Sequence, residues 1–283
     1  MVYRRDFRRQ QPPTEFFSRW SVTHLIIFVT VITFFLFLIL SFLIPSIMDF
    51  VAIKPSLILS GMYLWTIVTS IFMHAGFFHL FVNMFSLFFL GSLVEKIIGR
   101  RRFIWFYLIA GVVGSLFFVL FTYLGGFVPR GDFIFGGVDD FAVGASGAIF
   151  GLLGILATLL PRKKIYLIVG PLLVIVLQFS IGPFVSGSMG NVVNIASTIL
   201  IFLMIFSMFS PSSSFRRISM PLSLSFWLAP IVAIVPLLIV GFFVKLPIGN
   251  MAHLGGLVAG LIYGAYLRGK YKQKVKMLNR MIK

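Results

Sequence analysis

Ser146 stands in residues 142–154, AVGASGAIFGLLG, where small residues surround a single hydroxyl at the start of an apolar run. Serines within apolar helices usually bond back to their own helix or pack against a neighbour. A serine becomes a nucleophile only where a base takes its proton, and histidine is the usual base near neutral pH. A catalytic role for Ser146 therefore requires a histidine within hydrogen-bond reach.

A histidine with glycines on the same helical face lies near the start of the last apolar run. The histidine is His253, and the glycines are Gly256 and Gly260, three and seven residues later. A second glycine stripe, beside Ser146, consists of Gly147, Gly151 and Gly154. Such stripes let two helix backbones approach closely in lipid, either for packing alone or to bring a hydroxyl and an imidazole together. We expect the two helices to touch.

His79 and Asn83 stand at i and i+4 in HAGFFHLFVNMFSLFFLG, so they share one helical face and lie about 6 Å apart along the axis. Each side chain can donate a hydrogen bond to the oxyanion that forms when Ser146 attacks a carbonyl, as can the Ser146 backbone N–H. A plain hydrogen bond to another helix is the alternative. His74 and His24 stand at membrane edges, and we assign them no chemistry.

The acidic residues are not spaced to complete a triad. Asp139 and Asp140 precede Ser146 in a loop where we expect them to face solvent, so the sequence favours a Ser–His dyad. The two histidines of HAGFFH stand at i and i+5 without the glutamate of an H-E-x-x-H helix, which argues against a metalloprotease. The chain contains no cysteine, which excludes disulfides and thiolate chemistry.

The elements that must position these side chains are membrane spans. The chain has 283 residues, 59% hydrophobic and 11% charged, a composition far from that of soluble domains. Eight runs approach the roughly 20 residues that cross a bilayer: 22–44, 78–97, 103–124, 145–160, 165–182, 191–209, 222–244 and 250–268. Run 22–44 is too long for a signal-peptide core. Prolines and glycines break residues 45–77, which indicates a partly helical loop at the outer membrane face.

The charge distribution predicts the topology. With the N-terminus inside, most of the 24 Lys and Arg, including Arg216 and Arg217, fall on cytoplasmic flanks, as the positive-inside rule requires. The predicted outer segments hold Lys54, Arg130, Lys245, Asp49, Asp132, Asp139 and Asp140. Topology thus explains the net charge of +17 better than nucleic-acid binding does, and the basic tail is expected to meet anionic lipid heads. Three spans separate the Ser146 and His253 helices, so both enter from the outside.

Three motifs, each weak alone, occur together: GASG at the head of one span, H-x-x-x-N on an earlier one and AH-x-x-G-x-x-x-G on the last. Together they resemble the rhomboid family of intramembrane serine proteases, over about residues 63–267. The resemblance implies an all-α, polytopic transmembrane helical bundle with a six-helix core, to which this chain adds two spans among 165–244. We accordingly divide the chain into a basic cytoplasmic segment 1–21, a protease domain 22–268 and a basic cytoplasmic tail 269–283.

Carried over residue by residue, the resemblance makes Ser146 the nucleophile and His253 the general base. His79 and Asn83 match the oxyanion-stabilising pair. Phe150 stands where some members have a tyrosine stacked on the histidine. The residues expected to pack around the site are Gly144, Gly147, Gly151, Gly256, Gly260 and Phe150.

Two positions outside the site also bear on the resemblance. Glu95 matches an acidic position of the family at the inner end of its span. Thr66 follows a tryptophan where the family commonly has arginine, and this departure concerns the anchoring of the loop rather than the chemistry. The histidine stands on the eighth predicted span instead of the sixth, and an added pair of spans preserves its orientation.

The resemblance implies hydrolysis of peptide bonds in or near the transmembrane segments of other proteins, without metal or cofactor. The expected partners are these substrates and membrane lipids, with no nucleic acid, and the oligomeric state stays open. We expect a multi-pass protein of a prokaryotic cell membrane, with both termini cytoplasmic and the site open to the outer side. The alternatives are a catalytically silent member that retains transmembrane clients, and a transporter or channel, although the polar groups gather near the outer edge rather than the midplane.

Overall fold

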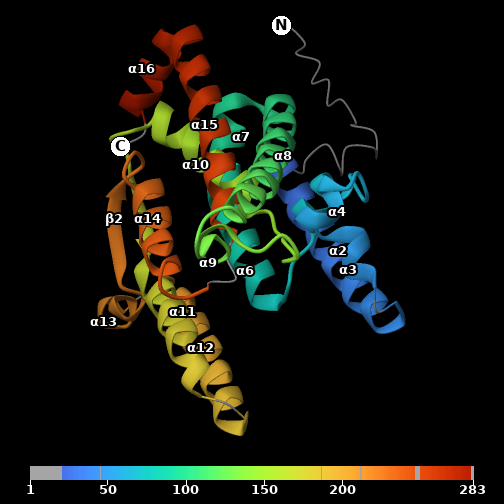
Figure 1. The fold of residues 1–283 in the computed structure, drawn as a ribbon. Coiled ribbons are helices and arrows are strands. Elements are labelled where there is room, and N and C mark those ends of the chain that lie inside the picture. Colours follow the sequence, from blue (N-terminus) through green and yellow to red (C-terminus); the bar gives the residue numbers. More distant parts are fainter. Residues whose placement is uncertain (1–20, 45, 186, 211, 246–248, 282–283) are drawn as a thin grey trace, which may run out of the picture.

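The computed structural model describes residues 21–281 except 45, 186, 211 and 246–248, so nearly all of the predicted segment 1–21 lies outside the described residues. The described chain is mostly helical (Figure 1). Four of its helical stretches are long and apolar enough to cross a membrane: Val22–Leu43, Phe77–Ile98, Arg100–Gly125 and Gly187–Ser207. The chain is therefore a helical membrane protein, whereas the count of eight spans stays a prediction.

Most predicted spans correspond to helices with similar bounds. These are α2 (Val22–Leu43), α8 (Arg100–Gly125), α10 (Ser146–Leu159), α12 (Gly187–Ser207), α14 (Ala229–Gly241) and α15 (Asn250–Lys270). The second predicted span comprises α6 (Phe77–Ser86), the π-helical turn η2 (Leu87–Gly91) and α7 (Ser92–Ile98). Gly99 separates α7 from α8 with a φ of +85°, a conformation that glycine adopts without strain. The tail forms α16 (Lys272–Met281).

The predicted loop 45–77 is partly helical, as its prolines and glycines indicate. It contains α3 (Ile47–Val51), α4 (Pro55–Leu59), α5 (Thr66–Thr69) and the 3-10 turn η1 (Ser70–Phe72). The Trp65 indole N–H donates to the Phe50 carbonyl oxygen at 2.9 Å and closes this segment on itself. A further short helix, α9 (Gly131–Phe135), precedes α10.

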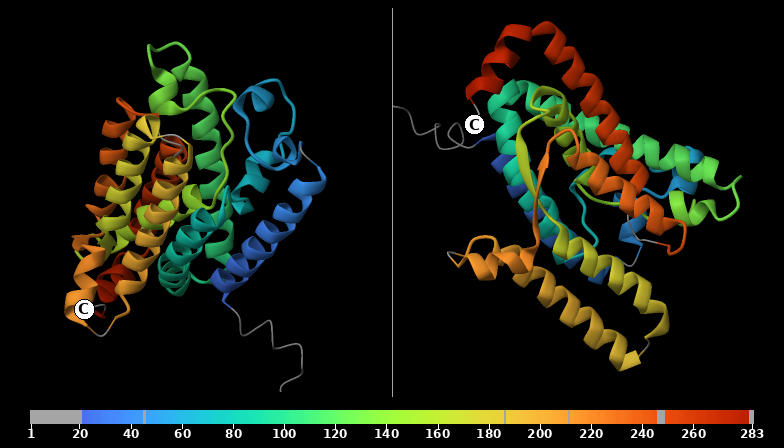
Figure 2. Two further views of the ribbon diagram at one scale, coloured as in Figure 1. Left: turned by 90° about the horizontal axis from the view of Figure 1, so that it is seen from below. Right: turned by 90° about the vertical axis from the view of Figure 1, so that its left-hand side faces the viewer.

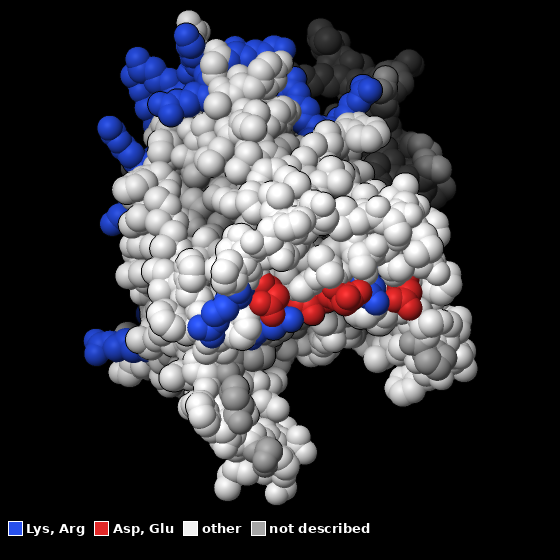
Figure 3. Space-filling view, in the orientation of Figure 1, with Lys and Arg blue, Asp and Glu red and all other residues white. Residues whose placement is uncertain are grey.

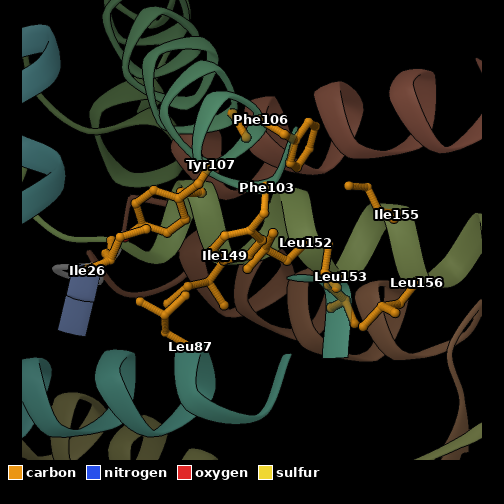
Figure 4. Close-up of a cluster of buried hydrophobic side chains, with 14 of the residues drawn as sticks. Ile26, Leu87, Phe103, Phe106, Tyr107, Ile149, Leu152, Leu153, Ile155 and Leu156 are labelled. Atoms are coloured by element: carbon orange, nitrogen blue, oxygen red, sulfur yellow. The ribbon is translucent and has the colours of Figure 1, made fainter. Parts of the chain in front are cut away.

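The core of the bundle surrounds α10. This helix packs mainly against α15 and α8 (Figure 1). Its buried aliphatic side chains meet aromatic side chains of α8 in the cluster drawn in Figure 4. The labelled members from these two helices are Phe103, Phe106, Tyr107, Ile149, Leu152, Leu153, Ile155 and Leu156. Lipid is as apolar as these side chains, so close van der Waals packing rather than removal from water holds the helices together.

A two-stranded sheet corrects the all-α prediction. β1 (Lys164–Ile168, KIYLI) pairs antiparallel with β2 (Pro221–Ser225, PLSLS), with Lys164 opposite Ser225 and Ile168 opposite Pro221. Both strands occupy the first residues of predicted spans, 165–182 and 222–244. β-branched and aromatic residues favour a strand in KIYLI, and Pro221 is compatible with the first position of a strand. Hydropathy alone does not distinguish a short strand from the end of a helix.

The ribbon leads into a helical hairpin that projects away from the other helices (Figures 1 and 2). Its elements are α11 (Val169–Ile181), η3 (Gly182–Phe184) and α12, followed by α13 (Ser213–Arg216) and η4 (Arg217–Ser219). α11 and α12 pack mainly against each other, whereas α14 packs against α10 and α15. The α11–α12 hairpin therefore stands apart from the helices that pack around α10, and the addition of two spans to a six-helix core stays a prediction.

Phenylalanine side chains of α12 attach the hairpin to α6. The Phe202 ring centroid lies 5.1 Å from that of Phe81, and the Phe206 centroid lies 5.8 Å from that of Phe81. Further along, the centroids of Phe209 and Phe85 are 6.0 Å apart. Since α6 carries two of the predicted site residues, the α11–α12 hairpin supports the helix that positions them.

Charged side chains mark the two ends of the bundle. Figure 3 shows the visible acidic side chains in one band, whereas Lys and Arg gather mainly at the opposite end. We call the end with residues 100–102 the basic end, and the end with Asp139 and Asp140 the acidic end. Arg216 and Arg217 depart from the predicted grouping, because they precede β2 at the far end of the ribbon from Lys164.

Candidate active site

Ser146 is the first residue of α10, after the N-cap residue Ala145. The first bond within this helix runs from the Ile149 N–H to the Ala145 carbonyl oxygen at 3.0 Å. The N–H groups of the preceding first-turn residues therefore have no partner within the helix. Together with the helix dipole, they make the surroundings of Ser146 favourable for a developing negative charge.

Ser146 and His253 are joined by a hydrogen bond. His253 Nε2 lies 2.8 Å from Ser146 Oγ. His253 stands one turn into α15 and is 9% exposed, whereas Ser146 is partly exposed. The hydroxyl therefore has a base beside it and an open side from which another group can approach.

Glycines form the contact between α10 and α15. A methyl group at Gly256 would lie 1.8 Å from the Gly147 carbonyl oxygen, and one at Gly260 would lie 2.1 Å from the Gly151 carbonyl oxygen. Neither position accepts alanine unless a helix moves. The two pairs follow the same order along both helices, so α10 and α15 run parallel and present the hydroxyl and the imidazole at the same end.

A third helix, α8, joins this contact, which sequence reasoning missed. A methyl group at Gly114 would lie 2.8 Å from the Ala252 carbonyl oxygen and 3.4 Å from Gly147 Cα. The α8 backbone therefore passes close to both helices beside the Ser–His pair. The signal for this contact is a set of small residues at helix-packing spacings: Ala110, Gly111, Gly114 and Ser115.

Phe150 covers one face of the His253 ring. The two ring centroids are 4.4 Å apart and their planes are inclined by 14°. The phenyl ring thus occupies the stacked position that the sequence assigns to it. His253 Nδ1 is buried and has no hydrogen-bond partner within the described residues, so packing rather than a carboxylate orients the imidazole there.

The aspartates that precede α10 bind lysines. Lys54 Nζ lies 3.6 Å from Asp139 Oδ1, and Lys245 Nζ lies 2.8 Å from Asp140 Oδ2. Partial burial raises the pKa of Asp140, but hydrogen bonds from Lys245 and from the Gly137 N–H, with the charge of Lys245, outweigh burial and lower it. Both carboxylates belong to the charged surface of the acidic end.

His79 lies beside Ser146 in the structure. A methyl group at Gly144 would lie 3.0 Å from His79 Nε2 and 3.8 Å from Ser146 Oγ, so the two side chains converge on Gly144. Gly144 has a φ of +130°, which side chains disfavour. Asn83 is buried, and its Nδ2 donates to the His79 carbonyl oxygen at 2.9 Å. A primary amide carries a second N–H, which can serve another acceptor.

His74, to which the sequence assigned no role, packs behind His79. Its side chain is 1% exposed, and the two imidazole rings meet edge to face with centroids 5.0 Å apart. Burial, followed by the charge of His79, lowers the pKa of His74 to about 3, against a smaller opposite effect of the Phe72 backbone. The only signal in the sequence is the five-residue separation from His79.

The short helices of residues 45–77 hold the segment that leads to Ser146. The Gly144 N–H donates to the Ser70 carbonyl oxygen at 2.9 Å. Ile53 and Ala142 exchange two backbone hydrogen bonds of 3.0 and 2.8 Å. These contacts fix the direction in which the chain enters α10.

Glu95 and Thr66 have structural partners. The buried Glu95 carboxylate accepts hydrogen bonds from the Val22 and Thr23 N–H groups, each at 2.8 Å, and from Thr23 Oγ1 at 2.7 Å. It thereby satisfies N–H groups at the start of α2 and ties α7 to that helix. The buried Thr66 hydroxyl donates to the Tyr63 carbonyl oxygen at 2.8 Å, a local bond within the turn that begins α5.

These features define a class: a multi-pass helical membrane protein in which a serine and a histidine meet across two glycine-lined helices. The sequence profile described as "Rhomboid domain" matches residues 61–204, which is half of the chain. The matched part includes His79, Asn83 and Ser146 and ends before His253. The chain belongs to the rhomboid family.

Several relatives share parts of the chain. RHOMBOID-like protein 1 of Arabidopsis thaliana is 38% identical over 116 residues, which cover 41% of this chain and 26% of that protein. Rhomboid protease GluP of Bacillus subtilis is 32% identical over 139 residues, 48% of this chain and 24% of that protein. Inactive RHOMBOID-like protein 8 of Arabidopsis thaliana is 34% identical over 100 residues, 35% of this chain and 24% of that protein. The chain thus spans about a quarter of the length of these relatives.

Proposed function

We propose that this chain is an intramembrane serine endopeptidase that cleaves peptide bonds in or near the transmembrane segments of other membrane proteins. The observation that carries the proposal is the 2.8 Å distance between Ser146 Oγ and His253 Nε2. Similarity to a protein named as a rhomboid protease supports the reaction class. The multi-pass helical fold supports a substrate that also lies in the membrane.

In the proposed reaction, His253 Nε2 takes the proton of Ser146 Oγ as the oxygen attacks a substrate carbonyl carbon. The protonated imidazole then gives this proton to the leaving amine, and an acyl-enzyme remains on Ser146. A water molecule, deprotonated by His253, attacks the ester and releases the second product. Phe150 keeps the imidazole ring in one plane through both steps, since its ring stacks on His253.

The oxyanion of the tetrahedral intermediate would be stabilised from two directions. The first-turn N–H groups of α10, including that of Ser146, point out of the helix at its start. His79 lies across Gly144 from the hydroxyl, and Asn83 has one amide N–H beyond its bond to the His79 carbonyl oxygen. Removal of one such donor typically costs 10²- to 10³-fold in rate, so His79→Ala and Asn83→Ala are expected to be impaired but not inert.

The depth of the site follows from the length of α10. Its 14 residues extend about 21 Å, less than the roughly 30 Å hydrocarbon core. If α10 ends at the basic membrane surface, Ser146 lies below the opposite surface, in a hollow that water enters from the acidic end. A substrate helix must unwind there, because helical amides are hydrogen-bonded and sterically hidden. We therefore expect faster cleavage of a segment containing Gly or Pro than of a poly-Leu segment of equal length.

The test is cleavage of a transmembrane reporter by the full chain in proteoliposomes. Ser146→Ala and His253→Ala are expected to lower the rate by at least about 10³-fold, because each removes one member of the proton-transfer pair. Ser60→Ala and His24→Ala are the matched controls, since both residues are exposed and outside the site. Wild-type rates in both site variants, with normal expression, would overturn the proposal.

A catalytically silent member that retains transmembrane clients is the second candidate, favoured by the similarity to a relative named as inactive. A fluorophosphonate probe separates the two candidates, because it reacts only with an activated serine. We expect labelling of wild type and none of Ser146→Ala. A wild-type chain that neither labels nor cleaves, while it still binds the reporter, would establish the silent alternative.

A further inference from the structure

A long groove lies between α8 and α15, and no residue of the Ser–His site lines it. Its volume is about 1110 Å³. Phe106, which is 5% exposed, forms part of the floor and stacks on Tyr263 with ring centroids 5.1 Å apart. The walls include apolar or aromatic side chains that are more than half exposed: Trp105, Ile109, Ile262 and Tyr266.

The groove ends in three consecutive arginines. Arg100, Arg101 and Arg102 line this end and form the first turn of α8, where the helix dipole adds a partial positive charge. The nearby carboxylate is that of Glu95, which is 3.9 Å from Arg100 Nε and is bound to the start of α2. Within the part of the chain that the structure describes, Arg101 and Arg102 make no ion pair. The mouth of the groove is therefore strongly cationic.

The tail adds cations around one phenol ring. The Arg102 guanidinium lies over the Tyr271 ring, 5.3 Å from its centroid, and Nη2 donates to the Tyr271 hydroxyl at 3.0 Å. Lys270 and Lys274 place their Nζ atoms 5.9 and 5.7 Å from the same centroid. Arg102 is thus held in place and keeps further N–H donors for an anion, because a guanidinium has five.

We propose that this groove binds one anionic glycerophospholipid of the leaflet at the basic end. Its phosphate lies at Arg101 and Arg102, and an acyl chain follows the apolar walls between α8 and α15. Guanidinium groups suit phosphate because they donate two parallel hydrogen bonds to its oxygens. Basic pockets between transmembrane helices are typical binding sites for the head groups of anionic lipids.

The groove is long enough for an acyl chain to follow it through one leaflet. Its lining on α8 runs from residue 100 to Phe117, which corresponds to roughly 25 Å along the helix axis. Half of the hydrocarbon core is about 15 Å thick, so an acyl chain can lie along the wall over the full depth of its leaflet. Trp105 and Tyr266 stand one turn from Arg101 and Lys270, the arrangement of aromatic residues at a membrane interface.

The charge pattern favours a lipid over another protein segment. The groove is basic at one end and apolar beyond it, as a phospholipid is anionic at one end and apolar beyond it. Most side chains that line the groove are bulky, including the exposed Ile109 and Ile262, whereas transmembrane helices associate mainly through small residues. A second copy of the chain would also have to bring its own negative charge to the arginines, and the acidic side chains visible in Figure 3 lie in a band away from the basic end.

The test is native mass spectrometry of the full chain purified with equimolar phosphatidylglycerol and phosphatidylcholine. We expect wild type to retain phosphatidylglycerol with about tenfold preference, and R101Q/R102Q to lose that preference. R162Q/K164Q is the matched control, because it removes the same charge at exposed positions outside the groove, and it should retain the preference. I109W/I262W fills the groove from both walls and should lose the adduct with all arginines present.

Other outcomes would overturn the proposal. Equal retention of both lipids by wild type would show that the groove does not select an anionic lipid. The same loss in R162Q/K164Q as in R101Q/R102Q would show that general surface charge causes the preference. Displacement of the lipid by millimolar inorganic phosphate would show that the apolar groove contributes nothing. A dimer that disappears in I109W/I262W would assign the groove to a second copy of the chain. All these readouts are independent of proteolysis.

Discussion

The imidazole of His253 is oriented by packing. Phe150 stacks on one face, and Ser146 is bonded to Nε2. Within the described residues, Nδ1 has no carboxylate to select its tautomer. In such a site, the stacked phenyl ring performs part of the positioning that the aspartate performs in a Ser–His–Asp triad.

Substitution of Phe150 tests this positioning. Phe150→Tyr keeps an aromatic ring over the imidazole, so we expect reporter cleavage within about threefold of wild type. Phe150→Ala removes a stacked pair worth about 0.5–1.5 kcal/mol, so kcat/KM should fall by about two- to twelvefold. Phe42→Ala, at a residue that is 82% exposed, is the control for loss of a phenyl ring. An unchanged rate in Phe150→Ala would show that the ring only fills space.

His74 predicts a dependence of stability on pH. Its pKa falls from the ordinary value of 6.5 to about 3 in the folded chain, so the folded state keeps it neutral. Below pH 6.5 the unfolded chain binds a proton there that the folded chain does not. The contribution of His74 is therefore complete above pH 6.5 and is lost progressively as the pH falls towards 3.

We expect this loss to reach about 2 kcal/mol at pH 5. Thermal unfolding of wild type and His74→Phe in detergent, at pH 7 and pH 5, measures it. The variant should lose less stability on acidification than wild type. His24→Phe, at an exposed histidine, should follow wild type, and parallel pH profiles for wild type and His74→Phe would contradict the prediction.

The glycine contact sets the distance between α10 and α15, and hence between hydroxyl and imidazole. In lipid, close backbone approach brings van der Waals contacts that larger side chains would prevent. The same contact thus serves packing and, in the proposed function, chemistry.

A methyl group placed at this contact tests whether the glycines set the Ser–His distance. A methyl group placed elsewhere on α15 controls for the general effect of alanine in a helix. Gly256→Ala would place a carbon 1.8 Å from the Gly147 carbonyl oxygen, whereas nothing lies within 4 Å of a methyl group at Gly269 on the same helix. We expect Gly256→Ala to cost 1–3 kcal/mol of stability and about 10²-fold in cleavage through misplacement of the imidazole. Gly269→Ala should match wild type in both assays. Equal activity of the two variants would place the control of the Ser–His distance elsewhere.

On the face that Figure 3 shows, Lys and Arg gather mainly at one end of the molecule, and the acidic side chains form a band towards the other. From the positive-inside rule we predict an orientation with the basic end in the cytoplasm. The ribbon and hairpin are the exception, since Arg216 and Arg217 do not lie beside Lys164.

Cysteine labelling checks this orientation directly, because the chain has no native cysteine. In intact cells, Ser60→Cys should react with a membrane-impermeant maleimide. Arg101→Cys and Gln273→Cys should react only after permeabilisation, since both stand at the basic end. Ser214→Cys is expected to differ from Arg101→Cys, because α13 lies away from that end (Figure 1). Labelling of Ser60→Cys and Arg101→Cys from the same side would contradict the topology.

Patterns within contiguous residues were enough to predict the long helices, the partly helical loop and the glycine faces that meet. Hydropathy, helical spacing and flanking charge act over one or two turns, so they are present in the sequence before folding. The glycine stripes and the predicted topology paired Ser146 with His253, and the family resemblance then assigned a role to each. The β-ribbon was missed because a five-residue apolar strand and the end of an apolar helix have the same hydropathy.

Contacts between segments that are distant in the sequence could be found only in the tertiary structure. No local pattern places Gly114 of α8 against Ala252, stacks His74 behind His79, or sets the α11–α12 hairpin apart from the helices around α10, because each depends on which helices become neighbours. The groove between α8 and α15 arises in the same way, from the angle and spacing at which two helices pack. Sequence thus supplies the faces that each helix offers, and the packing of all helices determines which faces meet.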